Sequence, residues 1–152
     1  MADFIIAIIS SFVATLGYAL VYDIKGKNLF VASLGGAFSW AVYLICQHYS
    51  VSLVFPYLMS GIATALYSEV AAYFCKAPAT VFLIPGIIPL VPGLTVFRTM
   101  ESCLFGDVSA FAEGLVTTIK IGGAIALGLI FMSAFFRLVR SALAIARTRV
   151  KG

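Results

Sequence analysis

The sequence of 152 residues has the length of one domain, but its composition excludes an ordinary water-soluble one. Apolar residues make up 62% of the chain and charged residues only 11%, whereas soluble domains carry roughly 25% charged residues. A short chain has too much surface to cover with so few charges, and intrinsic disorder requires the opposite composition. The composition therefore predicts an integral membrane protein.

The net charge of +4 does not indicate a nucleic-acid partner, because half of the ten basic residues lie in the last 16 positions, after a long apolar run. Such a cluster beside a membrane span sets orientation and contacts anionic lipid. The cysteines, Cys46, Cys75 and Cys103, form no CxxC pair, so we expect no disulfide framework, no metal site and no cofactor. The N-terminus carries Asp3 and no basic residue. It therefore differs from a signal peptide, and we expect the first apolar stretch to be retained.

Five weakly charged runs are long enough to be membrane spans. About 20 helical residues cross a hydrocarbon core of roughly 30 Å, and the connections leave no room for a soluble domain. We therefore predict an all-α membrane domain over residues 1–152, ending in a basic helix at the cytoplasmic interface. The predicted spans are residues 4–22, 29–46, 53–74, 79–97 and 111–136, and the predicted interfacial tail is 137–152.

Basic residues predict the orientation. Lys25 and Lys27 lie in the first loop, Lys76 follows the third span, and the second loop has no basic residue. Placing these lysines and the tail inside makes eight of ten basic residues cytoplasmic. Arg98 is then expected in an outer loop and Lys120 within the fifth span. This arrangement requires an odd number of crossings, with the N-terminus outside and the C-terminus inside. Four spans with a re-entrant fourth segment are the alternative.

Small residues recur at a spacing of four, which lets helix backbones approach closely in lipid. We interpret this spacing as packing within one protomer, and an interface with another chain is the alternative. The pairs are Gly35/Ser39, Gly61/Ala65, Gly122/Ala126 and Ala124/Gly128.

The fourth span contains Pro85, Pro89 and Pro92, together with Gly86 and Gly93. Each proline lacks an N–H and clashes with the carbonyl four residues earlier, so this spacing predicts a broken helix. Irregular backbone at membrane depth is tolerated only where it is buried or lines a wet cavity. Freed carbonyls can coordinate a cation, and a helix restarting there can direct its N–H groups at an anion. We therefore predict a substrate or ion site at this segment, and a kinked packing helix is the alternative.

The same segment resembles a known family. The stretch from Ser68 to Gly93, with the core KAPATVFLIPGIIPLVPG, resembles the signature of the threonine/serine exporter (ThrE) family. It is most similar to the short membrane subunit of the two-component members, which are linked to succinate export. The chain length, the Gly106-Asp107 pair and the Gly-rich last span agree with this resemblance.

The resemblance implies efflux of amino acids or dicarboxylates across a bacterial cytoplasmic membrane. Single-chain members also carry a soluble region and a second membrane half, so the resemblance implies a larger ThrE-type partner subunit with a soluble region. A unit with an odd number of spans, joined to a related unit, forms the inverted repeats of alternating-access transporters. We therefore predict the membrane subunit of a two-component secondary exporter for threonine, serine or succinate, all small carboxylate substrates.

Ionisable residues within spans are costly and usually face an interior. Glu69, near the inner end of the third span, is a candidate proton carrier, or it pairs with a basic residue such as Lys76. The alternative is a carboxylate that lies among the lipid headgroups.

Glu113, Thr117 and Lys120 face one way on the fifth span. Lys120 is a candidate for binding a substrate carboxylate and Glu113 for proton transfer, and structural anchoring is the alternative for both. We expect His48 to be an interface residue rather than a proton relay.

No enzyme motif was found: the chain lacks HExxH, a nucleophile elbow and a P-loop. We therefore predict that the protein is not an enzyme. Two alternatives to a transporter subunit remain open. One is a non-transporting assembly subunit, and the other is a homo-oligomeric channel.

Overall fold

The computed structural model describes residues 2–150, and the described part is all-helical, as predicted. Side chains at positions 2, 140 and 142–150 lie outside the description. The elements are α1 (Ala2–Val21), α2 (Lys27–Tyr49), α3 (Val54–Cys75), α4 (Thr80–Ile87), the 3-10 turn η1 (Ile88–Leu90), α5 (Gly93–Leu104) and α6 (Val108–Val150).

Four helices are long and apolar enough to cross a membrane: α1, α2, α3 and the Val108–Val139 part of α6. A fifth crossing is present if α4, η1 and α5 form one span, which is bent by 51° at the break. The predicted all-α membrane fold is therefore confirmed, and the prediction of about five spans with a broken fourth one agrees with these four to five candidate spans.

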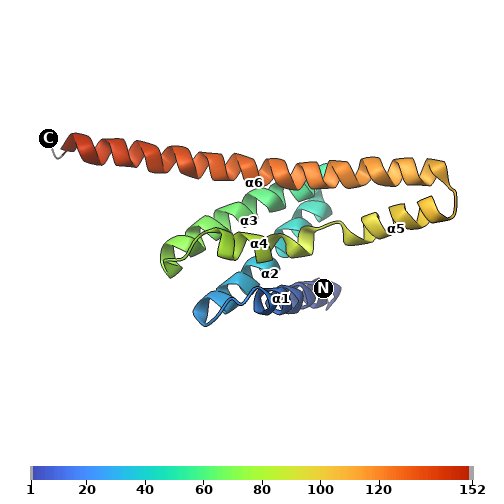
Figure 1. The fold of residues 1–152 in the computed structure, drawn as a ribbon, viewed down its shortest axis with the longest axis horizontal. Helices are drawn as coiled ribbons and strands as arrows, with labels where there is room; N and C mark the ends of the chain where they lie inside the picture. The colour runs from blue at the N-terminus through green and yellow to red at the C-terminus, as the bar shows by residue number, and fades with distance from the viewer. Residues whose placement is uncertain (1, 151–152) are drawn as a thin grey trace.

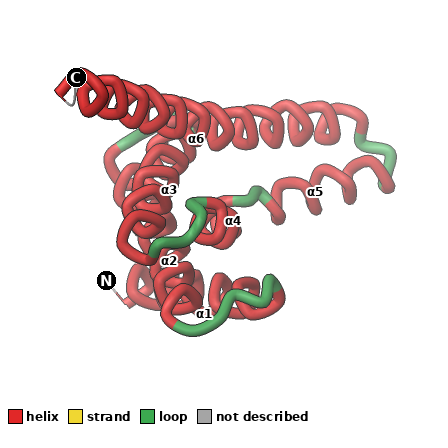
Figure 2. The backbone as a smooth tube through the Cα atoms, turned by 60° about the vertical axis from the view of Figure 1, so that its left-hand side comes forward, coloured by secondary structure: helices red, strands yellow, loops and turns green. Residues whose placement is uncertain are grey.

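Helices α1 to α4 form a bundle in which α2 contacts α1, α3 and α4 (Figure 1). Helix α5 packs on the N-terminal part of α6, and the two form an antiparallel hairpin that extends from one end of the bundle. Figure 2, turned by 60°, shows the hairpin beside the bundle again. Helix α6 therefore connects the hairpin to the bundle, because its middle crosses α3.

The C-terminal end of α3 and the N-terminal end of α2 lie at the same end of the bundle (Figure 1). The C-terminal half of α6 also extends toward this end. Lys25 in the loop before α2, Lys27 at the start of α2 and Lys76 at the end of α3 therefore share one end, as the charge pattern requires. Which face of the membrane this end occupies stays a prediction.

Small residues let α3 and α6 cross at backbone contact. A Cβ added to Gly61 would lie 2.9 Å from the Ile125 carbonyl oxygen, and one added to Gly128 would lie 2.6 Å from that of Leu58. Ala65 and Ala124 are buried at this crossing. Packing within one protomer is therefore confirmed for the pairs Gly61/Ala65 and Ala124/Gly128. Gly122 and Ala126 are instead exposed.

Two apolar clusters hold the broken helix against the bundle. Phe82 of α4 is fully buried in the first cluster, with Ala32 and Ala72. Leu90 of η1 is buried in the second cluster, beside Tyr43 of α2 and Ile121 of α6. Helix α4 and the η1 turn that follows it are therefore both fixed to neighbouring helices.

The predicted last span and the predicted tail form one helix, because α6 continues for 43 residues to Val150. Its interfacial position stays a prediction, and residues 151 and 152 lie outside the described part.

The Gly106-Asp107 pair makes the turn between α5 and α6. Gly106 has φ +76°, and the Asp107 N–H donates to the Ser102 carbonyl at 3.0 Å, which is a Schellman ending. The Asp107 carboxylate then caps α6 by accepting hydrogen bonds from the Ala110 N–H and the Ser109 hydroxyl, both at 2.9 Å. The pair thus has a structural role that orients the hairpin.

Candidate functional site

The helix break lies where the proline spacing predicts it. Helix α4 ends at Ile87, η1 follows, and Val91 is extended. Pro92 has φ −77° and ψ 55°, and the Gly93 N–H donates to the Val91 carbonyl at 2.7 Å. This geometry is an inverse γ-turn. Helix α5 then begins at Gly93 in a new direction.

Local hydrogen bonds satisfy two of the carbonyls that the prolines were expected to free. The Pro85 carbonyl accepts from the Ile88 N–H, and the Ile88 carbonyl accepts from the Val91 N–H at 3.3 Å. Tight i to i+3 bonds of this kind commonly replace missing helical bonds. These two carbonyls already have a partner within the chain.

A hydroxyl group of α2 ties Gly86 into the bundle. The Ser39 hydroxyl of α2 donates to the Gly86 carbonyl at 2.7 Å. A Cβ on Gly86 would lie 2.9 Å from Thr64 Cγ2, so only glycine allows α4 to lie this close to α3. Pro85 and Gly86 are both buried. The first half of the Pro/Gly segment is therefore a packed junction of α2, α3 and α4.

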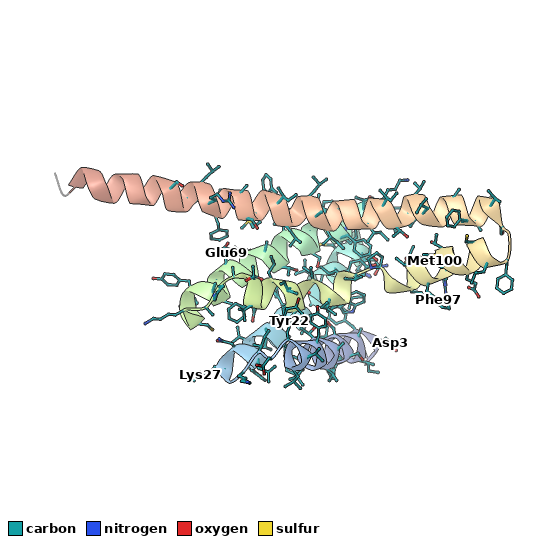
Figure 3. All side chains as sticks on the ribbon, viewed as in Figure 1. Asp3, Tyr22, Lys27, Glu69, Phe97 and Met100 are labelled. Atoms are coloured by element: carbon teal, nitrogen blue, oxygen red, sulfur yellow. The ribbon has the colours of Figure 1, made fainter. Side chains whose placement is uncertain are left out.

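An open groove of about 480 Å³, lined mainly by polar residues, lies between α5 and the first turns of α6. Helix α5 keeps its polar side toward α6, while Phe97 and Met100, labelled on α5 in Figure 3, are exposed. A helix in lipid turns its polar side toward protein or water in this way. The groove is lined by Leu94, Thr95, Arg98, Thr99 and Ser102 of α5 and by Ala110, Glu113, Gly114 and Thr117 of α6.

The two walls meet at Thr99 and Gly114. A Cβ on Gly114 would overlap the Thr99 side chain. Thr99 is only 6% exposed, and its hydroxyl donates to the Thr95 carbonyl at 2.7 Å. Gly114 therefore allows the close approach that brings the polar residues of α5 against α6.

Arg98 and Glu113 line the same groove from opposite helices. Both side chains are exposed. These two described side chains do not form an ion pair with each other. The groove therefore presents one cation and one anion that do not pair with each other.

The structure brings some of the predicted site residues to this groove. Glu113 and Thr117 line it, and Gly93 lies directly before the first lining residue of α5, exposed and with open space where a Cβ would be. Pro89 and Pro92 are partly buried at the break. Helix α5 thus connects the break to the groove.

Three other candidates lie outside the groove. Lys120 is exposed and is not part of the groove lining. Glu69 is partly buried in α3, away from the hairpin (Figure 3). Lys76 is exposed and ends α3 in a left-handed conformation, φ 52°. The ten predicted residues therefore do not form one site.

Sequence reasoning missed the α5 wall of the groove. Residue 98 was expected in an outer loop, but α5 continues to Leu104 and places Arg98 within a helix. That loop prediction was wrong. The charged residues Arg98 and Glu101 do not end helix α5, because its polar side faces α6. The available signal was the spacing of Thr95, Arg98, Thr99 and Ser102, which repeats at i, i+3, i+4 and i+7.

One comparison with known proteins identifies a family. The family model described as Threonine/Serine exporter, ThrE, matches residues 7–135. No solved structure matches the chain significantly. The matched residues include the break and both walls of the groove. The chain is a multi-pass membrane protein of a transporter family and belongs to the threonine/serine exporter (ThrE) family.

Proposed function

We propose that the chain is the membrane subunit of a two-component secondary exporter in a bacterial cytoplasmic membrane. Its substrates are small carboxylate-bearing metabolites, namely threonine and serine or succinate. The observation that carries the proposal is the continuity of the broken helix with the polar wall of the groove, at Gly93 and Leu94. Secondary transporters bind substrates at discontinuous helices of this kind.

The groove has chemistry suited to a carboxylate. The Arg98 guanidinium can hold a carboxylate with two parallel hydrogen bonds. Thr95 and Thr117 add hydroxyl groups on the two walls. The carboxylate is the group that threonine, serine and succinate share, so Arg98 serves each of these substrates.

A larger partner subunit would complete the site. The groove has walls from two helices only, and the outer side of α5 is apolar and exposed. Counting α4 and α5 as one span gives five crossings, and a related unit would then face the opposite way across the membrane. Rocking of the two units would open the groove to alternate sides. The exposed apolar residues of α5 are Leu94, Val96, Phe97, Met100 and Leu104.

The proposal is tested by efflux of preloaded labelled threonine, serine and succinate from cells that lack their own exporters. Three strains are compared. The first expresses this chain alone, and the second expresses it with the neighbouring large-subunit candidate. The third expresses the Arg98→Gln variant of this chain with the same large subunit. We expect efflux only when both wild-type chains are present. Efflux with this chain alone would indicate a homo-oligomer and contradict the two-component arrangement. Absence of efflux from well-expressed, assembled subunits would favour an assembly role.

A further inference from the structure

Helices α1 and α3 end in the same backbone motif at one end of the bundle. After α1 the Ile24 N–H donates to the Ala19 carbonyl at 3.0 Å, and an equivalent bond of 3.3 Å ends α3. Such bonds, with a left-handed residue directly before the donor, are Schellman endings. The left-handed residue is Asp23 after α1, with φ 56°, and Lys76 after α3, with φ 52°.

Lys76 is an unusual residue for this position. A Cβ crowds the backbone in the left-handed conformation, so glycine is the usual choice at such a helix ending. Among other residue types, asparagine, aspartate and histidine are the ones enriched there. The chain therefore keeps a long cationic side chain where glycine would strain the backbone less. An outlier of this kind indicates a role for the side chain.

Lysine side chains gather at this end of the bundle. Lys25, Lys27 and Lys76 are all exposed, and Figure 3 shows Lys27 at the end where α2 begins. Asp23 pairs with Lys25 at 2.9 Å. Lys27 and Lys76 therefore add two positive charges that this carboxylate does not balance. We call Lys25, Lys27 and Lys76 the lysine surface.

The two turns that carry these lysines pack on one apolar cluster. Ile24 and Leu29, which flank the first two lysines, pack against the buried cluster around Phe82. Ala77, which follows Lys76, packs against the same cluster. The lysine surface is therefore one continuous part of the molecule, built from the α1–α2 turn and the α3–α4 turn.

Exposed aromatic side chains adjoin the lysine surface. Tyr22 lies just before the first turn, and Tyr73 and Phe74 lie just before Lys76; all three are exposed. Tyrosine is enriched at the membrane–water interface, where its ring meets lipid and its hydroxyl meets water. The lysines are therefore at the level where phospholipid phosphates lie.

We propose that the lysine surface binds the headgroups of anionic phospholipids. A lysine ammonium holds a phosphate as a point charge, and clustered lysines beside a span attract anionic headgroups. The occupant is a lipid rather than a free phosphate ion, because exposed apolar side chains such as Val21 and Phe74 adjoin the lysines and acyl chains can cover them. The site lies outside the groove and does not depend on the proposed transport function.

The experiment uses the purified full chain in detergent, titrated with phosphatidylglycerol as the anionic probe and with phosphatidylcholine as the neutral one. Native mass spectrometry counts the bound lipids. We expect phosphatidylglycerol to bind more tightly. Lys27→Gln and Lys76→Gln should each weaken its binding about fivefold. The basic tail is the same in every variant, so its own contribution to lipid binding cancels in the comparison.

Lys120→Gln is the matched control, because Lys120 is an exposed lysine of α6 outside the lysine surface. It should leave the binding of phosphatidylglycerol unchanged. Lys76→Gly should weaken this binding and yet raise the unfolding midpoint in detergent without added lipid, because glycine relieves the left-handed strain. A lower midpoint would overturn the interpretation that lysine is kept there for its charge.

Three results would overturn the lipid site itself. The first is wild-type binding of phosphatidylglycerol by the double variant Lys27→Gln/Lys76→Gln. The second is equally tight binding of phosphatidylcholine. The third is displacement of the bound lipid by inorganic phosphate, which would make the surface a site for the free ion. Each result leaves the proposed exporter function untouched, because none of them measures transport.

Discussion

Ser39 and Gly86 lie 47 positions apart in the chain and are joined by a hydrogen bond of 2.7 Å. The Ser39 hydroxyl also lies 2.9 Å from the Gly36 carbonyl of its own helix. A hydroxyl has one hydrogen to donate, so these two carbonyls share it. Ser39 is therefore the side chain that ties the broken helix to α2.

Replacing Ser39 with alanine should loosen this junction. The buried Gly86 carbonyl would lose its hydroxyl partner, at a cost of about 1 kcal/mol in unfolding free energy. Ser33→Ala is the control, because Ser33 is equally buried and donates only to the Leu29 carbonyl within α2. Thermal unfolding of the purified protein in detergent measures both variants. Equal midpoints would contradict a special role for Ser39.

Gly128→Ala should disrupt the crossing of α3 and α6. The added Cβ would lie 2.6 Å from the Leu58 carbonyl oxygen and 2.9 Å from the Ile62 nitrogen, and backbone atoms cannot move aside cheaply. Gly122→Ala on the same helix meets nothing within 4 Å and should gain up to ~1 kcal/mol of helix propensity. The yield and unfolding temperature of monodisperse protein compare the two. Similar behaviour of both variants would mean that the crossing is not close-packed in the membrane.

The start of α6 should weaken in acid. Hydrogen bonds from the Ala110 N–H and the Ser109 hydroxyl lower the pKa of Asp107 below its ordinary 3.8. A lowered pKa means that the cap is fully stabilising above pH 3.8 and is lost as pH falls through the lowered value. Hydrogen exchange at the first turn of α6 should therefore lose protection in that range. Asp107→Asn keeps a capping group without titration, so it should remove this pH dependence. An unchanged profile would exclude Asp107 as its source.

A cysteine at position 93 should report on access to the groove. Gly93 is exposed and a Cβ there meets nothing within 4 Å. In a chain whose three cysteines are replaced, we expect Gly93→Cys to react with a polar thiol reagent in native membranes, and substrate to slow the reaction. Phe82→Cys, at a fully buried position, serves as the unreactive control. Lack of reaction at position 93 in a transporting complex would show that the break is closed to water.

Glu69→Gln should reduce transport while the complex remains assembled, if Glu69 carries a proton. Its position, partly buried in α3, is compatible with proton exchange during the cycle. Transport by the variant should be compared with wild type across the physiological range of about pH 5 to 8. Wild-type activity throughout this range would exclude the proton-carrier role, and co-purification of the partner subunit controls for assembly.

Local chemistry made much of this architecture predictable. The membrane class follows from composition, and the helix break follows from Pro85, Pro89 and Pro92, because a missing N–H and a ring clash act within a few residues of the proline. The structure places the restart at Gly93, as the spacing indicates. Proline chemistry does not predict where α5 ends, because α5 continues past Arg98 with its polar side against α6.

The sequence by itself therefore determined which segments are membrane helices and where one of them breaks. Only the tertiary structure decided that Gly86 is buried under the Ser39 hydroxyl while Arg98 and Glu113 share a groove. The groove depends on the close approach of Gly114 to Thr99, and the junction at Gly86 depends on the contact of α4 with α2 and α3. Both are contacts between helices, and helical periodicity within one segment carries no information about which side of a neighbouring helix it will meet.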